Sequence, residues 1–169
     1  MEFKIVQAET DSQIKEIAQM AKILWHDTYD SLLPDGQVDY MIEKFQSEEA
    51  VKRQIESENY IYYIVYAQDG TPAAYFGIVP DSRKKGEMLL SKIYIMKESR
   101  GMGAAGLVFT FVQEKAKALR QDKLYLTVNK ENLHAQKVYE HYGLACEEAV
   151  KNDIGSGYYM DDYIMSKTV

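Results

Sequence analysis

One glycine-rich segment constrains the fold of this chain more than any other. Residues 100–106 read Arg-Gly-Met-Gly-Ala-Ala-Gly, between a strand-like run at 88–97 and a helix-like run at 107–120. A glycine-rich turn that opens a helix leaves several backbone N–H groups unpaired at the positive end of the helix dipole. Such a turn is suited to binding phosphate. The sequence therefore predicts a strand, a phosphate-binding loop and a helix, in this order.

The residues around the loop exclude two common phosphate-binding motifs. Gly101, Gly103 and Gly106 satisfy the G-x-G-x-x-G spacing of dinucleotide-binding folds. That fold also needs a carboxylate at the end of the next strand, about twenty positions on. The strand expected at 123–128 reads Lys-Leu-Tyr-Leu-Thr-Val and carries none. A P-loop needs Gly-Lys-Ser/Thr, which does not follow here. A nicotinamide-dependent oxidoreductase is accordingly disfavoured.

Two motifs resemble those of the GCN5-related N-acetyltransferase (GNAT) family. Residues 100–105 match its motif Q/R-x-x-G-x-G/A. Residues 132–144 are similar to its second hallmark, a helix that carries Asn and Tyr before a Gly-hydrophobic turn. The two motifs occur in the family's order, with one strand between them. The ending at 160–165, Met-Asp-Asp-Tyr-Ile-Met, resembles the PaiA-like branch of bacterial polyamine acetyltransferases.

Hydrophobic periodicity predicts an element order that agrees with this resemblance. Strands are expected at 3–6, 60–67, 71–79, 87–96, 123–128, 144–151 and 158–167, with a flexible loop at 152–157. Helices are expected from about 11 to 33, 38 to 45, 48 to 55, 107 to 120 and 132 to 142. The prediction is an α/β (α+β) protein with one domain over residues 1–169. By resemblance its mixed, mostly antiparallel sheet is flanked by helices and splayed between the fourth and fifth strands.

The composition and charge of the chain argue against a membrane or nucleic-acid partner. Hydrophobic residues make up 46% and charged residues 27% of the chain, as in ordinary globular proteins. No apolar run approaches a membrane span, and no signal sequence opens the chain. The net charge is −6, without the basic cluster typical of nucleic-acid binding. We therefore expect a cytoplasmic protein with no membrane or nucleic-acid partner.

Three smaller features receive structural interpretations. Residues 83–85, Arg-Lys-Lys, are expected to form a solvated hairpin tip. Cys146, the one cysteine, is expected to be a small buried hydrophobe. His134 and His141 lie seven residues apart with no third ligand at metal spacing, so no metal site is expected. Homodimers occur in the family, and a homodimer is one expectation here, although no segment marks an interface.

The resemblance implies acetyl-CoA as the cofactor. Backbone N–H groups of residues 101–106 would hold the pyrophosphate, since glycine permits close approach of the backbone. The exposed backbone of the fourth strand would pair with the pantetheine arm and polarise the acetyl carbonyl. Asn132 would bind the cofactor arm, cap its helix, or do both. The expected cofactor-binding residues are Ile93, Tyr94, Ile95, Arg100, Gly101, Met102, Gly103, Ala104, Ala105, Gly106 and Asn132.

Catalysis needs an acid and a base, and only the acid has a clear candidate. Tyr139 lies four residues before Gly143, where the family carries a tyrosine that can protonate the leaving thiolate. Its alternative role is packing on the apolar stripe of its helix. At the position of Ser91, many polyamine-acetylating relatives carry a glutamate base. A serine cannot deprotonate an ammonium near neutral pH.

Other groups are left to take the proton. Glu87 lies on the same strand face as Ser91 and could act through water. So could the aspartates at 161 and 162, although each of these three carboxylates is expected to be exposed. Proton loss to a chain of water molecules alone is an equal alternative.

The expected acceptor is the primary amine of a small molecule, acetylated by direct transfer. A polyamine is favoured over an amino acid, an antibiotic or a protein N-terminus. The substrate-binding candidates are Trp25, Tyr29, Glu87 and Ser91. The alternative from another class is a catalytically weak acyl-CoA sensor, which Ser91 favours because it removes the base.

Overall fold

The chain forms two compact units that share one strand and one helix. The computed structural model describes residues 2–169. The N-terminal unit runs to Val79 and takes in Lys92–Phe111, and the C-terminal unit comprises Pro80–Ser91 and Val112–Val169. Strand β4 (Glu87–Ile95) and helix α4 (Ala104–Ala118) each contribute to both units. The expectation of one domain stays a prediction.

The strand order confirms the predicted fold class. The seven strands follow the order β1-β2-β3-β4-β5-β7-β6. The β4–β5 pair is parallel, and the pairs β1–β2, β2–β3, β5–β7 and β6–β7 are antiparallel. The sheet is therefore mixed and mostly antiparallel, as expected, and five α-helices accompany it in residues 2–169.

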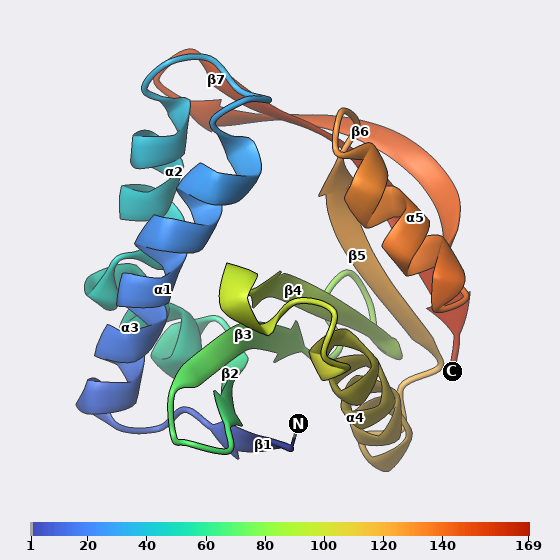
Figure 1. Cartoon of the computed structure of the whole chain (residues 1–169). Helices are drawn as coiled ribbons and strands as arrows, with labels where there is room; N and C mark the ends of the chain where they lie inside the picture. Colours follow the sequence, from blue (N-terminus) through green and yellow to red (C-terminus); the bar gives the residue numbers. More distant parts are fainter. Residues whose placement is uncertain (1) are drawn as a thin grey trace. The chain divides into compact units, whose positions relative to one another are not determined.

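The N-terminal unit combines three strands with three helices that pack on one another (Figure 1). Its elements are β1 (Phe3–Gln7), α1 (Asp11–Tyr29), α2 (Gln37–Gln46), α3 (Glu48–Ser57), β2 (Ile61–Ala67) and β3 (Pro72–Val79), followed later by the short helix η1 (Lys97–Ser99). Helix α1 starts at a capping box, in which Thr10 accepts from the backbone N–H of Gln13 and the Gln13 side chain accepts from Thr10. Ser47 caps α3 by accepting from the Ala50 N–H at 3.2 Å.

A fully buried set of polar side chains joins the three helices to β2 and β3. The Tyr75 hydroxyl donates to Gln46 Oε1 at 2.6 Å and accepts from Trp25 Nε1 at 2.9 Å. Gln46 Nε2 donates to the Tyr62 hydroxyl at 3.2 Å, and that hydroxyl donates to Gln54 Oε1. Burial raises the pKa of Tyr75 well above its ordinary value, so the phenol remains a donor. These bonds fix how α1, α2 and α3 lie on the strands.

Removing one hydroxyl from this set should destabilise the protein. Tyr75→Phe leaves Gln46 Oε1 and Trp25 Nε1 buried without their partner. We expect the free energy of unfolding, measured by urea denaturation, to fall by about 2 kcal/mol. The control is Tyr66→Phe, whose hydroxyl bonds Glu16 at the half-buried surface. Equal losses in the two variants would contradict a special role for the buried set.

The C-terminal unit is built on β5, β6 and β7 with the first half of β4. Its elements are β5 (Lys123–Asn129), α5 (Leu133–His141), β6 (Ala145–Gly155) and β7 (Tyr158–Thr168). The parallel ladder between β4 and β5 covers Glu87–Leu89 and Lys123–Tyr125 and then stops. Since both strands continue beyond this point, they separate there, which is the predicted splay.

The β6–β7 hairpin corrects two expectations from the sequence. The predicted loop at 152–157 is wrong, because β6 continues to Gly155 and pairs with Tyr158 (Figure 1). Ser156 and Gly157 both have positive φ, 53° and 80°, as a two-residue hairpin turn requires. The predicted burial of Cys146 is also wrong. This residue lies on β6, the last strand in the order, and is exposed.

Candidate active site

The loop predicted to bind phosphate has an open backbone at the start of α4. Gly101 and Gly103 adopt φ values of 75° and 91°, and no atom lies within 4 Å of where a Cβ would stand on either. The Leu107 N–H donates to the Gly103 carbonyl at 3.2 Å as the first helical bond. The N–H groups of residues 104–106 therefore precede the hydrogen-bond ladder of the helix. Helix α4 begins at Ala104, earlier than the predicted 107, so these donors belong to its first turn.

The Arg100 side chain ties this loop to two elements of the N-terminal unit. Its Nη2 atom lies 2.7 Å from Asp27 Oδ2 on α1, and its Nε donates to the Ile95 carbonyl at 3.1 Å. The neighbouring Met96 N–H donates to the Ala73 carbonyl on β3 at 2.8 Å. Arg100 thus orients the loop, whereas its predicted contact with cofactor stays a prediction.

The second half of β4 carries a backbone irregularity that the sequence does not reveal. Lys92 has a φ of 59°, which is unfavourable for a residue with a side chain. Its ammonium lies 5.0 Å from the centre of the Tyr60 ring and donates to the Tyr60 hydroxyl at 3.4 Å. Residues 93–95, the predicted cofactor-binding backbone, follow this irregularity directly. The sequence gives no sign of this irregularity, because lysine rarely adopts a left-handed conformation.

An aromatic cluster lies beside α1 in the same unit. The Tyr94 hydroxyl lies 2.8 Å from that of Tyr29, and the Tyr94 ring packs on Trp25 and Tyr75 with centroids 5.5 and 5.6 Å away. Trp25 is buried, and its indole N–H is used by Tyr75. Of the two predicted substrate contacts on α1, Tyr29 is the half-buried one with its polar end beside β4.

A groove of 530 Å³ lies in the N-terminal unit between the end of α1 and η1. Its lining residues are Ile23, Leu24, His26, Asp27, Asp30, Ser31, Met96, Lys97 and Glu98. Nδ1 of His26 lies 2.7 Å from Asp30, and Nε2 lies 2.8 Å from Asp39. Both hydrogen bonds raise the pKa of His26, and the bond to Asp30 has the larger effect. Asp27 pairs with Arg100 and Asp30 with His26, so these two carboxylates of the groove already have partners.

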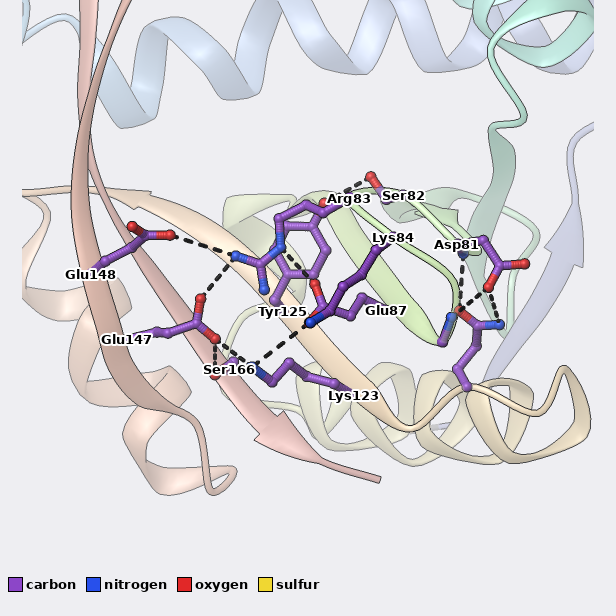
Figure 2. A network of polar contacts seen from close by, with 12 residues as sticks. Asp81, Ser82, Arg83, Lys84, Glu87, Lys123, Tyr125, Glu147, Glu148 and Ser166 are labelled. Atoms are coloured by element: carbon purple, nitrogen blue, oxygen red, sulfur yellow. Dashed lines mark hydrogen bonds and ion pairs between the residues drawn. The ribbon is translucent and has the colours of Figure 1, made fainter.

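Figure 2 shows an ion-pair network in the C-terminal unit. Arg83 donates to Glu87 and Glu147 at 2.8 Å each, and its guanidinium carbon lies 4.0 Å from the centre of the Tyr125 ring. Lys123 Nζ lies 2.6 Å from Glu147. Arg83 and Lys123 lower the pKa of Glu147 to about 2. Residues 83–85 are exposed, as expected for a solvated tip, but Arg83 also stacks on Tyr125 and pairs with Glu87 and Glu147.

The same network decides how Glu87 is placed. Glu87 is 7% exposed, contrary to the expectation of an exposed carboxylate, and it lies 3.5 Å from Lys84 as well as beside Arg83. Lys123 lies 3.9 Å from it, so three cations are within 4 Å of this carboxylate. Ser91, further along β4, is buried at 9% exposure. The substrate-binding roles of both residues stay predictions.

The second motif forms the helix that the sequence predicts. Asn132 caps α5 by accepting from the Ala135 N–H at 3.2 Å, and Gly143 closes it with a φ of 92°. Tyr139 is half-buried, and its carbonyl accepts from the Leu144 N–H at 3.0 Å. The capping role of Asn132 is confirmed, while cofactor contact by Asn132 and proton donation by Tyr139 stay predictions.

The two neighbouring aspartates of β7 differ in their surroundings. Asp161 Oδ1 lies 2.7 Å from the ammonium of Lys130. Asp162 is only 5% exposed, so the expectation that it is exposed is wrong. Burial raises the pKa of Asp162 to about 6, and the nearby charge of Asp161 adds to this effect. Alternation along the strand puts the two carboxylates on opposite faces of the sheet.

The comparison with known families decides the identity of the fold. The sequence model of the acetyltransferase (GNAT) family matches residues 19–144. The chain belongs to this family. No curated protein matches it in sequence.

Several solved GNAT structures are similar to the chain over almost its whole length. The PaiA N-acetyltransferase from Thermoplasma acidophilum, in complex with coenzyme A, has a TM-score of 0.80 at 16% identity and 100% coverage of both chains. A point mutant of spermidine N-acetyltransferase SpeG from Vibrio cholerae has a TM-score of 0.68 at 17% identity, covering 98% of this chain and 93% of that one. A GNAT-family acetyltransferase from Streptococcus pneumoniae has a TM-score of 0.66 at 24% identity, covering 99% and 100%.

As a GNAT enzyme the chain uses acetyl-CoA, and its loop fits the diphosphate of that cofactor. Left-handed glycines with open space beside them let a ligand reach the backbone closely. The first N–H groups of α4 point out of the helix at its positive end. Among residues 2–169, no three His, Cys, Asp or Glu side chains are placed to hold a metal ion. Nor is any helix in that range both long and apolar enough to cross a membrane.

A bulky residue in the loop should block the cofactor. Gly103→Val places a branched side chain over the open backbone, and we expect the Kd for CoA, measured by calorimetry, to rise at least about tenfold. The matched control is Gly70→Val, in the turn between β2 and β3, where φ is 86° and no atom lies within 4 Å. Both variants carry the same backbone strain, of about 1–2 kcal/mol. Equal CoA affinity in the two variants would exclude residues 101–106 as the phosphate site.

Proposed function

We propose that this GNAT enzyme transfers acetyl directly to the primary amine of a small molecule, with a polyamine favoured. The observation that carries the proposal is the full-length likeness to PaiA, at a TM-score of 0.80. The likeness to a spermidine N-acetyltransferase supports a polycationic acceptor. A net charge of −6 favours the approach of a cation.

The proposed mechanism divides the work among three parts of the chain. The first turn of α4 binds the diphosphate, and the cofactor supplies an activated acetyl thioester. Backbone groups of Ile93, Tyr94 and Ile95 align the pantetheine arm and polarise the carbonyl, as hydrogen-bond donors do in acyl transfer. Tyr139 donates its phenolic proton to the sulfur of the leaving thiolate.

Thiol release from acetyl-CoA across a panel of amines tests the proposal. The panel contains spermidine, spermine, putrescine, amino acids, aminoglycosides and short peptides. We expect amine-dependent release that is fastest with a polyamine. Faster release with another class of amine would mean that the acceptor belongs to that class. Tight CoA binding without turnover on any amine would favour the acyl-CoA sensor.

The role of Tyr139 can be separated from packing by a hydroxyl deletion. Tyr139→Phe should lower kcat by about 10²-fold, because it removes the acid, and leave the Kd for CoA nearly unchanged. Tyr142→Phe is the control, a second half-buried tyrosine at the end of α5. Parallel losses of turnover and CoA affinity in Tyr139→Phe would mean that this tyrosine only packs.

A further inference from the structure

We propose that Asp162 of β7 binds the ammonium group of the acceptor and takes its proton before acyl transfer. This inference rests on the proposed function and deepens it, since it names the residue that recognises the amine. It also assigns the base that the serine at position 91 does not supply. The residues that carry it all belong to the C-terminal unit.

Strand register places Asp162 on the same side of that unit's strands as Ser166 and Tyr125. The pairs Tyr125–Ser166, Thr127–Ile164 and Asn129–Asp162 succeed one another along β5 and β7. Directly paired residues of antiparallel strands point to the same side of a sheet. The parallel pair Leu89–Tyr125 puts alternate residues of β4, which include Ser91, on this side as well.

At one end of this face, the negative charges are paired with positive ones. The carboxylates of Glu87 and Glu147 meet the cations of Arg83 and Lys123 there, as Figure 2 shows. Ser166 completes this end by donating to Glu147 at 3.2 Å. Both carboxylates at this end therefore have their charge matched by cations already in place.

The other end of the face holds a carboxylate without a partner. Asp162 is 5% exposed, and within residues 2–169 no group donates a hydrogen bond to its side chain. Asn129, its cross-strand neighbour, uses its own Oδ1 to accept from the Glu131 N–H at 2.9 Å. On β6, the residue paired with Asp162 is Val150. A buried carboxylate in such surroundings is suited to a cationic ligand.

The charged groups nearest Asp162 have ion-pair partners other than Asp162. Lys130 and Asp161 are paired with each other on the opposite face. Glu148, two residues from Val150 on β6, is on the same face and lies 3.7 Å from Arg83. Within the described chain, no lysine or arginine of β5, β6 or β7 is therefore ion-paired with Asp162.

The chemistry balances when the amine nitrogen loses two protons, one before and one after it attacks. The carboxylate of Asp162 accepts a proton from the bound R–NH₃⁺ and leaves a neutral amine. The amine nitrogen then forms a bond to the acetyl carbon as the carbon–sulfur bond breaks. The thiolate takes a proton from Tyr139, and the second proton of the nitrogen passes to water, from which the Tyr139 phenol is restored. Asp162 later returns its proton to water. Its pKa of about 6 keeps it ionised near neutral pH and makes it more basic than an ordinary aspartate.

The decisive experiment compares Asp162→Asn, Asp162→Glu and Asp161→Asn with the wild-type enzyme. Spermidine is the first acceptor, followed by whichever amine of the panel the wild type acetylates fastest. Asn has nearly the same shape as Asp and no charge, and the Kd for CoA reports whether each variant is folded. Asp161→Asn is the matched control, because it removes the adjacent carboxylate on the opposite face.

We expect Asp162→Asn to lower kcat/KM by at least about 10²-fold and to raise KM for the amine, with CoA affinity unchanged. The acidic limb of the wild-type pH profile, near pH 6, should disappear in this variant. Asp162→Glu should restore part of the rate together with the limb. Under mildly alkaline conditions Asp161→Asn should keep most of the rate. It should also keep the limb, moved to lower pH because the charge of Asp161 no longer raises the pKa of Asp162.

Two outcomes would overturn the inference, and they are distinct. If the wild type acetylates amines and Asp162→Asn does so equally well with the same pH profile, the role of Asp162 is excluded and the proposed function stands. If the wild type binds CoA but acetylates no amine, the proposed function fails and this inference fails with it.

Discussion

The backbone of β4 is the constraint on which the arrangement of functional groups depends. Its ladder with β5 ends after Leu89, and at Lys92 the chain turns through a left-handed conformation. Strain of this kind persists only where surrounding contacts hold it, and the Lys92 ammonium on the Tyr60 ring is one such contact. Residues 93–95 follow this position at the end of β4, and Arg100 then fixes the start of the glycine loop to the Ile95 carbonyl.

The sequence predicts the elements with local causes and misses the features with distant ones. Caps at Asn132 and Gly143, and the glycines that open α4, follow from neighbours within a few positions, and the structure confirms them as helix boundaries. The position of Arg83 depends on Glu147, which is 64 residues away, so no local pattern reveals it. Exposure of Cys146 depends on β6 being last in the strand order, which is a property of the whole topology.

Part of the candidate site is predictable for the same reason. Motif spacing identifies the loop and Tyr139, since both belong to patterns of fixed length. The surroundings of carboxylates have no such signal: the sequence favours exposure for Glu87 and Asp162, and both are buried. What separates them is the set of cations in the turns next to them. Arg83 and Lys84 surround Glu87, whereas Lys130 is paired with Asp161 instead of Asp162.

The buried Asp162 has a thermodynamic consequence for the folded protein. Because its pKa is raised on folding, the folded state binds this proton more tightly than the unfolded chain does. The resulting stabilisation is fully present below the ordinary pKa of an aspartate and is lost as pH rises through about 6. The loss is on the order of 3 kcal/mol. Near neutral pH the protein therefore tolerates an unfavourable buried charge, and a cationic ligand that pairs with it would add to the stability of the fold.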